Sequence, residues 1–423
     1  MKIIIIGAGP GGYETALEAA SRGIEVVLVG EGPLGGVCLN EGCIPTKALC
    51  AMDAPDLERK RAVISKLQEG ISRMLSHRLI TFVSGRASLA GGTSVEVEGT
   101  VYEGDALIIA TGSVSASLPI PGAGLAVDSA AMLELDRAPG RLAVIGGGVI
   151  GLEFASIYRK FGSEVTVLEY CPNVLPRFDV DLAKRLKASL AKRGIKVETG
   201  ACVGGIVRND DGSLTVSWSR NGKAADTEAD CVLMAVGRKP NLSSLNLDDA
   251  GIKYGPGGIE VDENMRTNIP GVYAVGDITG GMMLAHAATA QGRRALNHIC
   301  GLSDNINFGI VPAAVFTVPE AASAGLAEQD CAGMDISVGK ANYRANGKAV
   351  ASGEEDGWCK VIADRSSGRI LGAHMLGAHA SDIIHEAAAL IALGTTAGQA
   401  KDLIHAHPTL SEVLQAAIHD IQA

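Results

Sequence analysis

The sequence has few aromatic residues and no excess of positive charge. It contains 6 Phe, 7 Tyr and 2 Trp among 423 residues, and 47 acidic residues against 37 Lys and Arg give a net charge of −10. Proteins that bind nucleic acid need basic surfaces for the phosphates and often aromatic side chains on which bases stack. The composition therefore argues against nucleic acid as a partner.

The sequence also lacks a segment suited to a membrane. The longest uncharged run, Ala106 to Val127, is long enough to cross a bilayer, but Pro119, Pro121 and several glycines interrupt it. An apolar, strand-like run begins at Lys2 and leads directly into a glycine motif, where a signal peptide would need a segment of its own. We therefore expect a cytoplasmic protein with no membrane partner.

The nine cysteines do not form the framework of a secreted protein. Their number is odd, they are spread along the chain, and only Cys38 and Cys43 are close neighbours. A structural zinc site usually needs four ligands, and no second close pair is present, so we expect no metal. The C-x₄-C spacing favours a small strained disulfide that can be opened and reformed, the alternative being two buried, unreactive thiols.

Glycine, in contrast, is abundant, with 54 residues, or about 13% against a usual share of about 7%. Two segments, residues 2–30 and 142–169, repeat the order strand, G-x-G-x-x-G, helix, strand. In such units one glycine makes the turn, one lets backbone N–H groups approach a pyrophosphate and one allows close helix packing. The sequence therefore predicts two Rossmann-like nucleotide-binding folds.

The remaining segments carry further candidates. A short apolar strand leads into Asp277, which could accept a hydrogen bond from a ribityl hydroxyl or merely cap a helix. From residue 301 onward, strand-like and helix-like segments without a glycine motif predict an α+β interface domain. Near the end, His407 could take a thiol proton while Glu412 fixes its tautomer, the alternative being a surface or packing histidine.

Taken in order, these motifs resemble those of the flavin-dependent pyridine nucleotide–disulfide oxidoreductases, and most closely the members that oxidise dihydrolipoamide. The matching pieces are GAGPGG, LGGVCLNEGCIPTKAL, IIATGS, GGGVIGLEFAS, VGRKPN, GVYAVGDIT, MMLAH and HAHPTLSE. The resemblance implies an α/β fold with an FAD domain in two parts (1–118 and 241–306), an NAD domain (119–240) and an α+β dimerisation domain (307–423).

The implied activity is oxidation of protein-bound dihydrolipoamide to lipoamide by a homodimer, with electrons passing through a Cys38–Cys43 disulfide and FAD to NAD⁺. The substrate would be a lipoyl-carrying protein, either a 2-oxoacid dehydrogenase lipoyl domain or a glycine cleavage carrier protein. By resemblance, Cys38 is the thiol that meets substrate, and Cys43 is the thiol beside the flavin. His407, oriented by Glu412, is the acid/base for the partner subunit's disulfide.

The resemblance also implies cofactor contacts, including an ion pair of Lys47 with Glu153 close to the flavin. The positions implied for FAD are Gly7, Gly9, Pro10, Gly11, Gly12, Glu31, Lys47, Thr111, Gly112, Ser113, Asp277, Met283, Leu284, Ala285 and His286. The positions implied for NAD are Gly146, Gly148, Val149, Ile150, Gly151, Glu169 and Gly237.

Two departures from the family pattern stand out. The acidic residue that ends the second strand of the FAD fold should fall 23 residues after Gly7, but that position is Gly30, which leaves Glu31 as the candidate for the ribose. The segment between Lys47 and Leu79 is some tens of residues shorter than usual, which predicts a trimmed helical cover over the substrate entrance.

Three alternatives remain to be weighed. Glutathione reductases usually carry an arginine cluster where Glu169 stands, and mercuric reductases carry a C-terminal cysteine pair, whereas no cysteine follows Cys359 here. A flavin-bearing docking subunit with little turnover is a hypothesis from another class. An NAD⁺-dependent assay with dihydrolipoamide distinguishes it from an enzyme.

Overall fold

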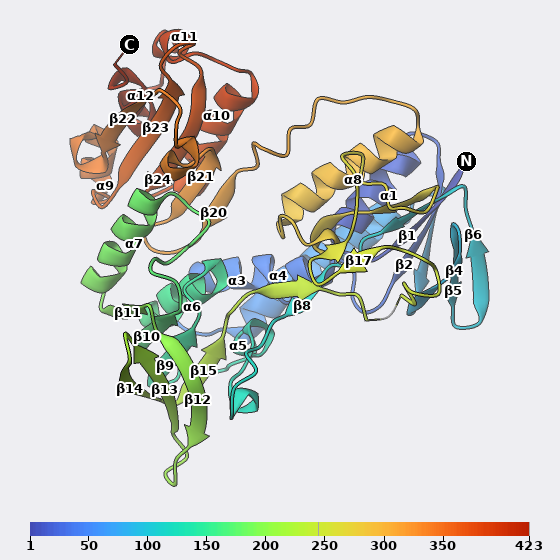
Figure 1. Cartoon of the computed structure of the whole chain (residues 1–423), viewed down its shortest axis with the longest axis horizontal. Helices are drawn as coiled ribbons and strands as arrows, with labels where there is room; N and C mark the ends of the chain where they lie inside the picture. Colours follow the sequence, from blue (N-terminus) through green and yellow to red (C-terminus); the bar gives the residue numbers. More distant parts are fainter. Residues whose placement is uncertain (244, 423) are drawn as a thin grey trace. The chain divides into compact units, whose positions relative to one another are not determined.

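The computed structural model describes residues 1–243 and 245–422, and its chain divides into two compact units (Figure 1). Unit 1 comprises Met1–Ala116, Ser129–Asp136 and Gly237–Ile306. Unit 2 comprises Ser117–Asp128, Arg137–Val236 and Asn307–Ala423. The domain boundaries expected from the sequence stay predictions.

Unit 1 is built on a parallel sheet. Its helices are α1 (Pro10–Ser21), α2 (Gly36–Asn40), α3 (Cys43–Cys50), α4 (Leu57–Leu75), α5 (Ser129–Met132), the 3₁₀ helix η2 (Gly276–Thr279) and α8 (Ala285–Ile299). Its strands are β1 (Lys2–Ile6), β2 (Glu25–Gly30), β3 (Ile80–Ser84), β4 (Ala87–Gly91), β5 (Ser94–Val97), β6 (Thr100–Glu103), β7 (Ala106–Ile109), β8 (Ser113–Ser115), β16 (Arg238–Pro240), β17 (Tyr254–Gly255), β18 (Gly258–Ile259) and β19 (Val272–Ala274).

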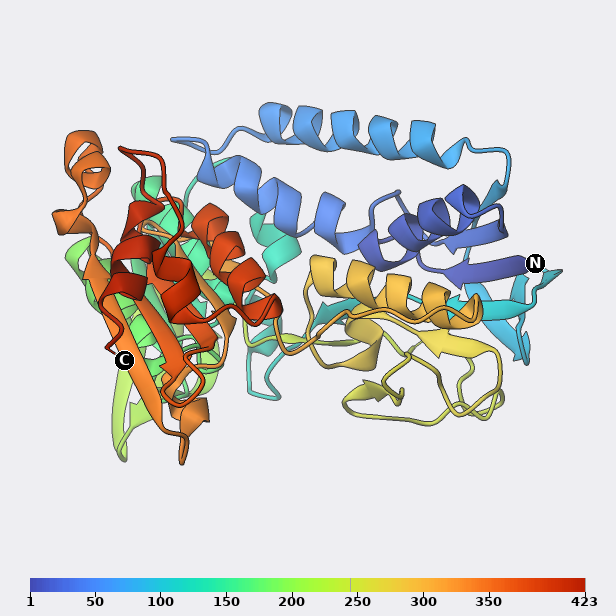
Figure 2. The ribbon, with the colours of Figure 1, turned by 90° about the horizontal axis from the view of Figure 1, so that it is seen from above.

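Five of these strands form the central sheet, in the order β19-β7-β1-β2-β3, and all neighbours are parallel. Strand β1 is apolar throughout its interior because a parallel sheet is covered on both faces, and Ile3, Ile4 and Ile5 are fully buried. Helix α8 lies along α1 (Figure 2). This close approach requires Gly292, since a Cβ there would lie 1.9 Å from Thr15 Oγ1.

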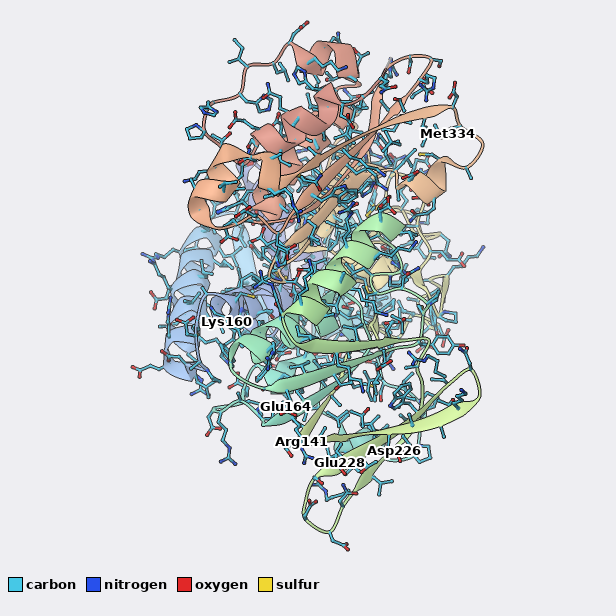
Figure 3. The ribbon with its side chains drawn as sticks, turned by 90° about the vertical axis from the view of Figure 1, so that its left-hand side faces the viewer. Arg141, Lys160, Glu164, Asp226, Glu228 and Met334 are labelled. Carbon is cyan, nitrogen blue, oxygen red and sulfur yellow. The ribbon has the colours of Figure 1, made fainter. Side chains whose placement is uncertain are left out.

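The first half of unit 2 combines a parallel with an antiparallel sheet. Its elements are η1 (Ala123–Leu125), β9 (Arg141–Ile145), α6 (Val149–Lys160), β10 (Glu164–Glu169), α7 (Val180–Lys192), β11 (Ile195–Thr199), β12 (Cys202–Arg208), β13 (Leu214–Arg220), β14 (Lys223–Ala229) and β15 (Cys231–Met234). The parallel order is β11-β10-β9-β15, and β12-β13-β14 form the antiparallel sheet. Arg141 joins the two sheets by an ion pair with Glu228, in which Nη1 and Oε2 lie 2.7 Å apart (Figure 3).

The second half of unit 2 is the predicted α+β module. Its elements are β20 (Ala313–Val315), β21 (Ala321–Gly325), η3 (Glu328–Cys331), β22 (Ile336–Asn342), η4 (Tyr343–Ala345), α9 (Gly347–Ser352), β23 (Trp358–Asp364), β24 (Ile370–Leu376), α10 (Ala380–Ala392), α11 (Ala397–Lys401) and α12 (Glu412–His419). The strands form one antiparallel sheet, β20-β21-β24-β23-β22. Helices α10 and α12 bury Ile384 and Leu414 in its core. The strands and helices expected in this module are confirmed.

A buried charge cluster joins the two halves of unit 2. Asp179 is fully buried and caps α7 by accepting hydrogen bonds from the N–H groups of Asp181 and Leu182. The ammonium of Lys360 on β23, itself only 1% exposed, lies 2.7 Å from Asp179 and 2.9 Å from Glu328. Burial alone would raise the pKa of Asp179, but the hydrogen bond and charge of Lys360, together with the hydrogen bond from the Glu328 N–H and the charge of His374, outweigh burial and hold this pKa below the usual value.

We expect Asp179→Ala to lower the free energy of unfolding by about 3 kcal/mol, because it removes a helix cap and one anion from a buried cation. A carboxyl whose pKa is lowered by folding stabilises the fold above its unfolded pKa of about 3.9, and this contribution is lost as the pH falls below it. The difference in free energy of unfolding between Asp179→Ala and wild type should therefore become smaller at low pH. Urea unfolding at several pH values measures it.

The matched control is Asp335→Asn, which breaks an exposed ion pair with Arg365. This substitution is expected to lower the free energy of unfolding by less than about 1 kcal/mol. An equal effect of the two substitutions would show that the buried cluster contributes nothing special to stability.

Candidate functional site

The first glycine loop lies between β1 and α1 and is shaped to receive an anionic group. Gly7 has a φ of +111°, and a Cβ on Gly12 would lie 1.8 Å from the carbonyl oxygen of Gly7, so the turn and the helix packing both require glycine. Gly9 caps α1, and the nearest atom to a Cβ there would be Gly36 Cα at 3.9 Å. Because no crowding within the protein demands glycine at position 9, its bare backbone leaves room for a ligand at the helix N-terminus.

The second glycine loop, between β9 and α6, repeats this geometry. Gly146 has a φ of +109°, and a Cβ on Gly151 would lie 2.0 Å from the Gly146 carbonyl oxygen. Gly148 caps α6, and nothing lies within 4 Å of the position of a Cβ there. Both loops therefore fit the pyrophosphate of a dinucleotide, with Pro10 and Gly11 in the first turn of α1 and Val149 and Ile150 in the first turn of α6.

Glu169 ends β10 with its side chain directed at the second glycine loop. It is only 7% exposed; Oε2 accepts a hydrogen bond from the Gly147 N–H at 2.5 Å, and Oε1 accepts one from the Cys171 N–H at 2.6 Å. Two backbone donors thus fix a carboxylate at the strand end where the ribose of a dinucleotide binds. Gly237, also predicted for NAD, directly precedes β16 and lies in unit 1.

Two of the predicted FAD positions, Ser113 and Asp277, are joined by a hydrogen bond in unit 1. Ser113 at the start of β8 donates a hydrogen bond of 2.5 Å to Asp277 Oδ2 in η2. Thr111 donates to the Asn241 carbonyl at 3.2 Å. Arg238, whose role we did not predict, donates to both the hydroxyl and the carbonyl of Ser113 at 2.7 Å. Arg238 lies in the VGRKPN motif, and this motif was the sequence signal that could have identified the arginine as a site residue.

The other expected FAD positions also lie in unit 1. Gly112 lies between Thr111 and Ser113, Met283 precedes Leu284, and Leu284 caps α8, which begins with Ala285 and His286. The N-terminus of α8 therefore follows η2 and Asp277 along the chain. Glu31 is exposed and comes directly after β2.

The two neighbouring cysteines lie on consecutive short helices. Cys38 is in α2 and partly buried, while the exposed Cys43 is the first residue of α3; both are free thiols in the structure. The hydrogen bond with the Cys43 thiol, together with burial, raises the pKa of Cys38 well above its ordinary value, and the charge of Lys47 opposes this. The thiols are therefore in contact, as the C-x₄-C spacing predicts.

Side chains that the sequence did not single out hold the loop of Cys38. The Asn40 amide donates to the carbonyl oxygens of Leu34 and Gly36 at 3.0 and 2.8 Å, and its Oδ1 accepts from Gln68 Nε2 on α4 at 2.6 Å. No sequence signal connects Gln68 with this loop, because the contact spans 28 residues. Helix α4 therefore supports the cysteine pair.

A buried lysine anchors α4 in turn. Lys60 is 1% exposed, and its ammonium donates to the Leu133 carbonyl and to Glu134 Oε1, each at 2.5 Å. The hydrogen bond from Lys60 lowers the pKa of Glu134. Although the segment between Lys47 and Leu79 is short, it contains a regular 19-residue helix, α4, which Lys60 anchors near its start.

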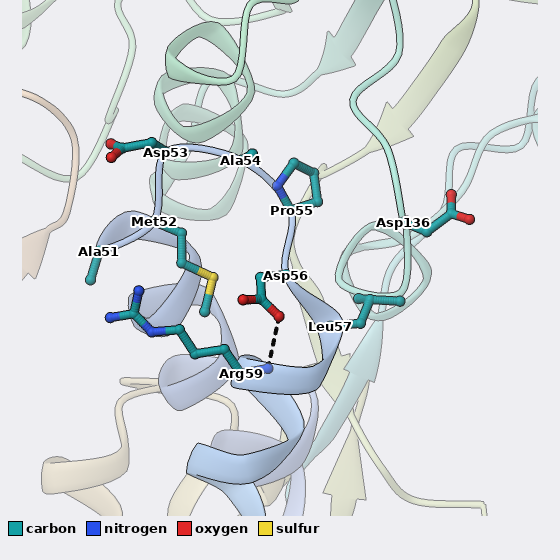
Figure 4. Close-up of a pocket in the computed structure, with 9 residues that line it drawn as sticks. All are labelled: Ala51, Met52, Asp53, Ala54, Pro55, Asp56, Leu57, Arg59 and Asp136. Atoms are coloured by element: carbon teal, nitrogen blue, oxygen red, sulfur yellow. Dashed lines mark hydrogen bonds between the residues drawn. The ribbon is translucent and has the colours of Figure 1, made fainter.

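The connection between α3 and α4 borders a cavity of about 580 Å³ (Figure 4). Asp56 caps α4 there by accepting a hydrogen bond from the Arg59 N–H at 2.9 Å. The lining residues are Ala51, Met52, Asp53, Ala54, Pro55, Asp56, Leu57, Arg59 and Asp136. The cavity thus lies at the C-terminal end of α3, whereas Cys43 lies at the N-terminal end of this helix.

His407 and Glu412 form the pair that the sequence predicts. His407 Nδ1 and Glu412 Oε1 lie 2.9 Å apart, and Glu412 Oε2 accepts a hydrogen bond from the Thr409 N–H at 2.8 Å. These contacts, first that from Thr409 and then that from His407, lower the pKa of Glu412. The carboxylate is thereby held anionic beside Nδ1, which leaves Nε2 of the exposed imidazole to exchange a proton.

A second pair next to it was not predicted. His405 Nε2 lies 2.7 Å from Glu386 Oε1 on α10, with the His405 side chain 8% exposed. The H-x-H spacing of the motif was the signal for His405, whereas nothing in the sequence connects Glu386 to it.

Lys47 and Glu153 lie in different units, so their ion pair stays a prediction. Glu153 on α6 is 4% exposed, and its Oε1 accepts a hydrogen bond from the Phe316 N–H at 3.0 Å. Within residues 1–243 and 245–422, no helix has the length and apolarity to span a membrane. In the same residues no group of three His, Cys, Asp or Glu side chains is placed to hold a metal ion.

Comparison with known proteins yields one consistent family. The model of the pyridine nucleotide-disulphide oxidoreductases matches residues 1–292, and that of their dimerisation domain matches residues 311–418. Dihydrolipoyl dehydrogenases of Bacillus subtilis and Geobacillus stearothermophilus are 37% and 38% identical, over 99% and 98% of this chain and 98% and 94% of those proteins.

Among solved structures, the HOCl-induced flavoprotein disulfide reductase RclA from Escherichia coli superposes with a TM-score of 0.91 at 30% identity, and all of each chain is covered. The α/β fold and the resemblance predicted from the sequence are confirmed. With family models over nearly all of its length, two dinucleotide loops and a contacting cysteine pair, the chain belongs to the pyridine nucleotide-disulphide oxidoreductase family, whose dihydrolipoyl dehydrogenases use FAD and NAD.

Proposed function

We propose that this protein is a dihydrolipoyl dehydrogenase that oxidises protein-bound dihydrolipoamide to lipoamide and reduces NAD⁺. The observation that carries the proposal is the contact between the Cys38 and Cys43 thiols, in a chain that aligns over nearly its full length with enzymes of that name. The substrate class is a lipoyl-carrying protein, from a 2-oxoacid dehydrogenase or from glycine cleavage. The expected cytoplasmic location stays a prediction.

The cysteines divide the thiol chemistry between them. In the oxidised enzyme, one substrate thiolate attacks Cys38 Sγ, the Cys38–Cys43 bond breaks, and Cys43 leaves as a thiolate. The second substrate thiol then displaces Cys38 and closes the lipoyl disulfide, so that two electrons now reside on the enzyme's thiols. Cys43 suits the leaving role because it is the first residue of α3, and a helix N-terminus stabilises a thiolate.

His407 supplies the proton transfers. Its Nε2 takes the proton from the attacking substrate thiol, while Glu412 stabilises the imidazolium that results. Since the 77% exposed His407 side chain projects from the module that matches the dimerisation domain, we propose that it serves the cysteine pair of the partner subunit in a homodimer. The neighbouring Ile404 is 99% exposed, as expected for a residue that a partner covers.

The two glycine loops hold the cofactors in this proposal. The first loop, with Ser113 and Asp277, binds FAD, and the second, with Glu169, binds NAD. Bound FAD supplies two-electron redox chemistry between the thiols and NAD⁺. Overall, dihydrolipoamide loses two electrons and two protons, NAD⁺ gains a hydride, and one proton is released.

A direct assay tests the proposal. The purified protein should reduce NAD⁺ with dihydrolipoamide, and faster with a lipoylated carrier domain, as followed by NADH absorbance. Glutathione disulfide with NADPH and mercuric ion with NADPH are the comparison substrates. Turnover on either comparison substrate exceeding that on dihydrolipoamide would overturn the assignment, and no turnover on any of them would favour a docking subunit.

We expect preference for NAD over NADP. The carboxylate of Glu169 can accept a hydrogen bond from a ribose 2′-OH but would repel a 2′-phosphate. Glu169→Ala should therefore narrow the ratio of kcat/KM for NAD over NADP by about tenfold or more, because each charged hydrogen bond is worth about 1.5–3 kcal/mol. Steady-state kinetics with both cofactors give the ratio, and equal efficiency in wild type would refute the expectation.

A further inference from the structure

Among the differences between the two dinucleotide folds of this chain, one in the loop and one at the strand end concern neighbouring positions. Counting from the first glycine of each motif, Ala8 corresponds to Gly147, and Gly30 corresponds to Glu169. Both strand-end positions close the second strand of their fold, β2 and β10. The ribose next to the pyrophosphate binds at this strand end in such folds.

In each fold the loop position and the strand-end position lie close together in space. A Cβ on Gly30 would lie 2.8 Å from the Ala8 Cβ, so a side chain at position 30 would require its surroundings to shift. In the second fold, a Cβ on Gly147 would lie 3.0 Å from the Glu169 Cβ, so glycine in the loop avoids crowding the glutamate. In this structure, an acidic residue at position 30 would require the backbone near Ala8 or the Phe82 ring to move.

An aromatic ring lies at that place in the first fold. The Cε2 and Cζ atoms of Phe82, on the edge strand β3, would be 3.0 and 3.3 Å from a Cβ on Gly30. Phe82 is a large apolar residue, and 36% of its surface is exposed. A partly exposed ring beside the ribose position offers an apolar face instead of a carboxylate.

We infer that the adenosine end of FAD binds against the ring of Phe82 in this chain, and that no carboxylate recognises its ribose hydroxyls. The inference rests on the assignment of the first loop to FAD. Contact of a base or sugar with an aromatic ring contributes binding energy without a hydrogen bond to the 2′-OH. The ligand is thus still FAD, but the protein does not discriminate for the 2′-OH of its adenosine ribose.

Glu31 is the competing candidate, and the second fold argues against it. The residue that corresponds to Glu31 is Tyr170, which follows Glu169 and is 74% exposed. Successive residues along a strand direct their side chains to opposite faces, so the residue after the strand end does not replace the one before it.

The sharpest test uses the wild-type holoenzyme. It is incubated with equal concentrations of FAD and an FAD analogue containing 2′-deoxyadenosine, and the flavins retained after gel filtration are quantified. We expect retention of the two within about twofold, whereas a carboxylate–hydroxyl bond would favour FAD by about tenfold. A preference of that size that disappears in Glu31→Gln would overturn the inference. A purified protein without bound flavin would instead refute the assignment of FAD.

Substitutions provide the second arm. Phe82→Ala should weaken FAD binding about tenfold, as followed by flavin fluorescence on dilution of the holoenzyme, and Phe82→Tyr should leave it within about twofold. Ala8→Gly/Gly30→Glu, which copies the second fold, should restore preference for FAD over the deoxy analogue. Unchanged FAD release from Phe82→Ala would overturn the role of the ring, and the analogue experiment remains decisive if that variant does not fold.

Discussion

Replacing Cys43 by Ser is expected to lower dihydrolipoamide turnover by about 10⁴-fold or more, because electrons can leave the substrate only through a disulfide that requires both sulfurs. Cys38→Ser should have a similar effect on turnover. The two variants should nevertheless differ in absorbance. Cys38→Ser leaves the Cys43 thiolate beside oxidised flavin and preserves a long-wavelength band, whereas Cys43→Ser removes it.

The matched control is Cys50→Ser, at the opposite end of α3. It should retain turnover within a few fold, since the helix keeps its length and Cys50 takes no part in the proposed exchange. Turnover assays and spectra during titration with dithionite provide both readouts. If both Cys38→Ser and Cys43→Ser kept full activity, the disulfide mechanism would be wrong.

His407→Gln is expected to lower turnover by about 10²- to 10⁴-fold while FAD stays bound, the usual range for loss of a general acid–base. His419→Gln, an exposed histidine at the end of α12, is the matched control and should change turnover little. Glu412→Gln should give a smaller loss than His407→Gln, because it keeps a hydrogen-bonding oxygen but removes the charge that stabilises the imidazolium.

Mixed dimers test whether His407 acts on the partner. When His407→Gln subunits are mixed with Cys38→Ser subunits, one site of each mixed dimer carries both lesions and the other carries neither. Activity should then partly return after subunit exchange. Mass spectrometry that shows mixed dimers without any recovery would mean that each subunit uses its own histidine or that His407 is not the base.

The sequence was most informative where one local pattern determines one conformation. The loops of Gly7 and Gly146 follow from residues next to each other in the chain, and so does the contact between Cys38 and Cys43. The pair of His407 and Glu412 is likewise local, since five residues separate them. Short-range geometry was therefore enough to predict these parts of the site.

Contacts between distant segments were beyond the sequence. Gln68 supports the Cys38 loop across 28 residues from Asn40, and Arg238 reaches Ser113 across 125 residues. A glutamine or arginine on a polar helix or strand carries no sign of which distant partner it will meet. Gly30 could be recognised as a departure, but its neighbours in space, Ala8 and Phe82, became apparent only in three dimensions.

The discontinuous layout of unit 1 has a consequence for biosynthesis. Strand β19 pairs with β7 and precedes Asp277, yet more than 150 residues separate these two neighbouring strands in the chain. A ribosome-bound chain that has exposed only its first 116 residues therefore lacks the outermost strand of the first nucleotide fold and the carboxylate beside it. Flavin capture must wait until most of the polypeptide has emerged, so premature termination in the intervening segment would release a fragment unable to retain the cofactor.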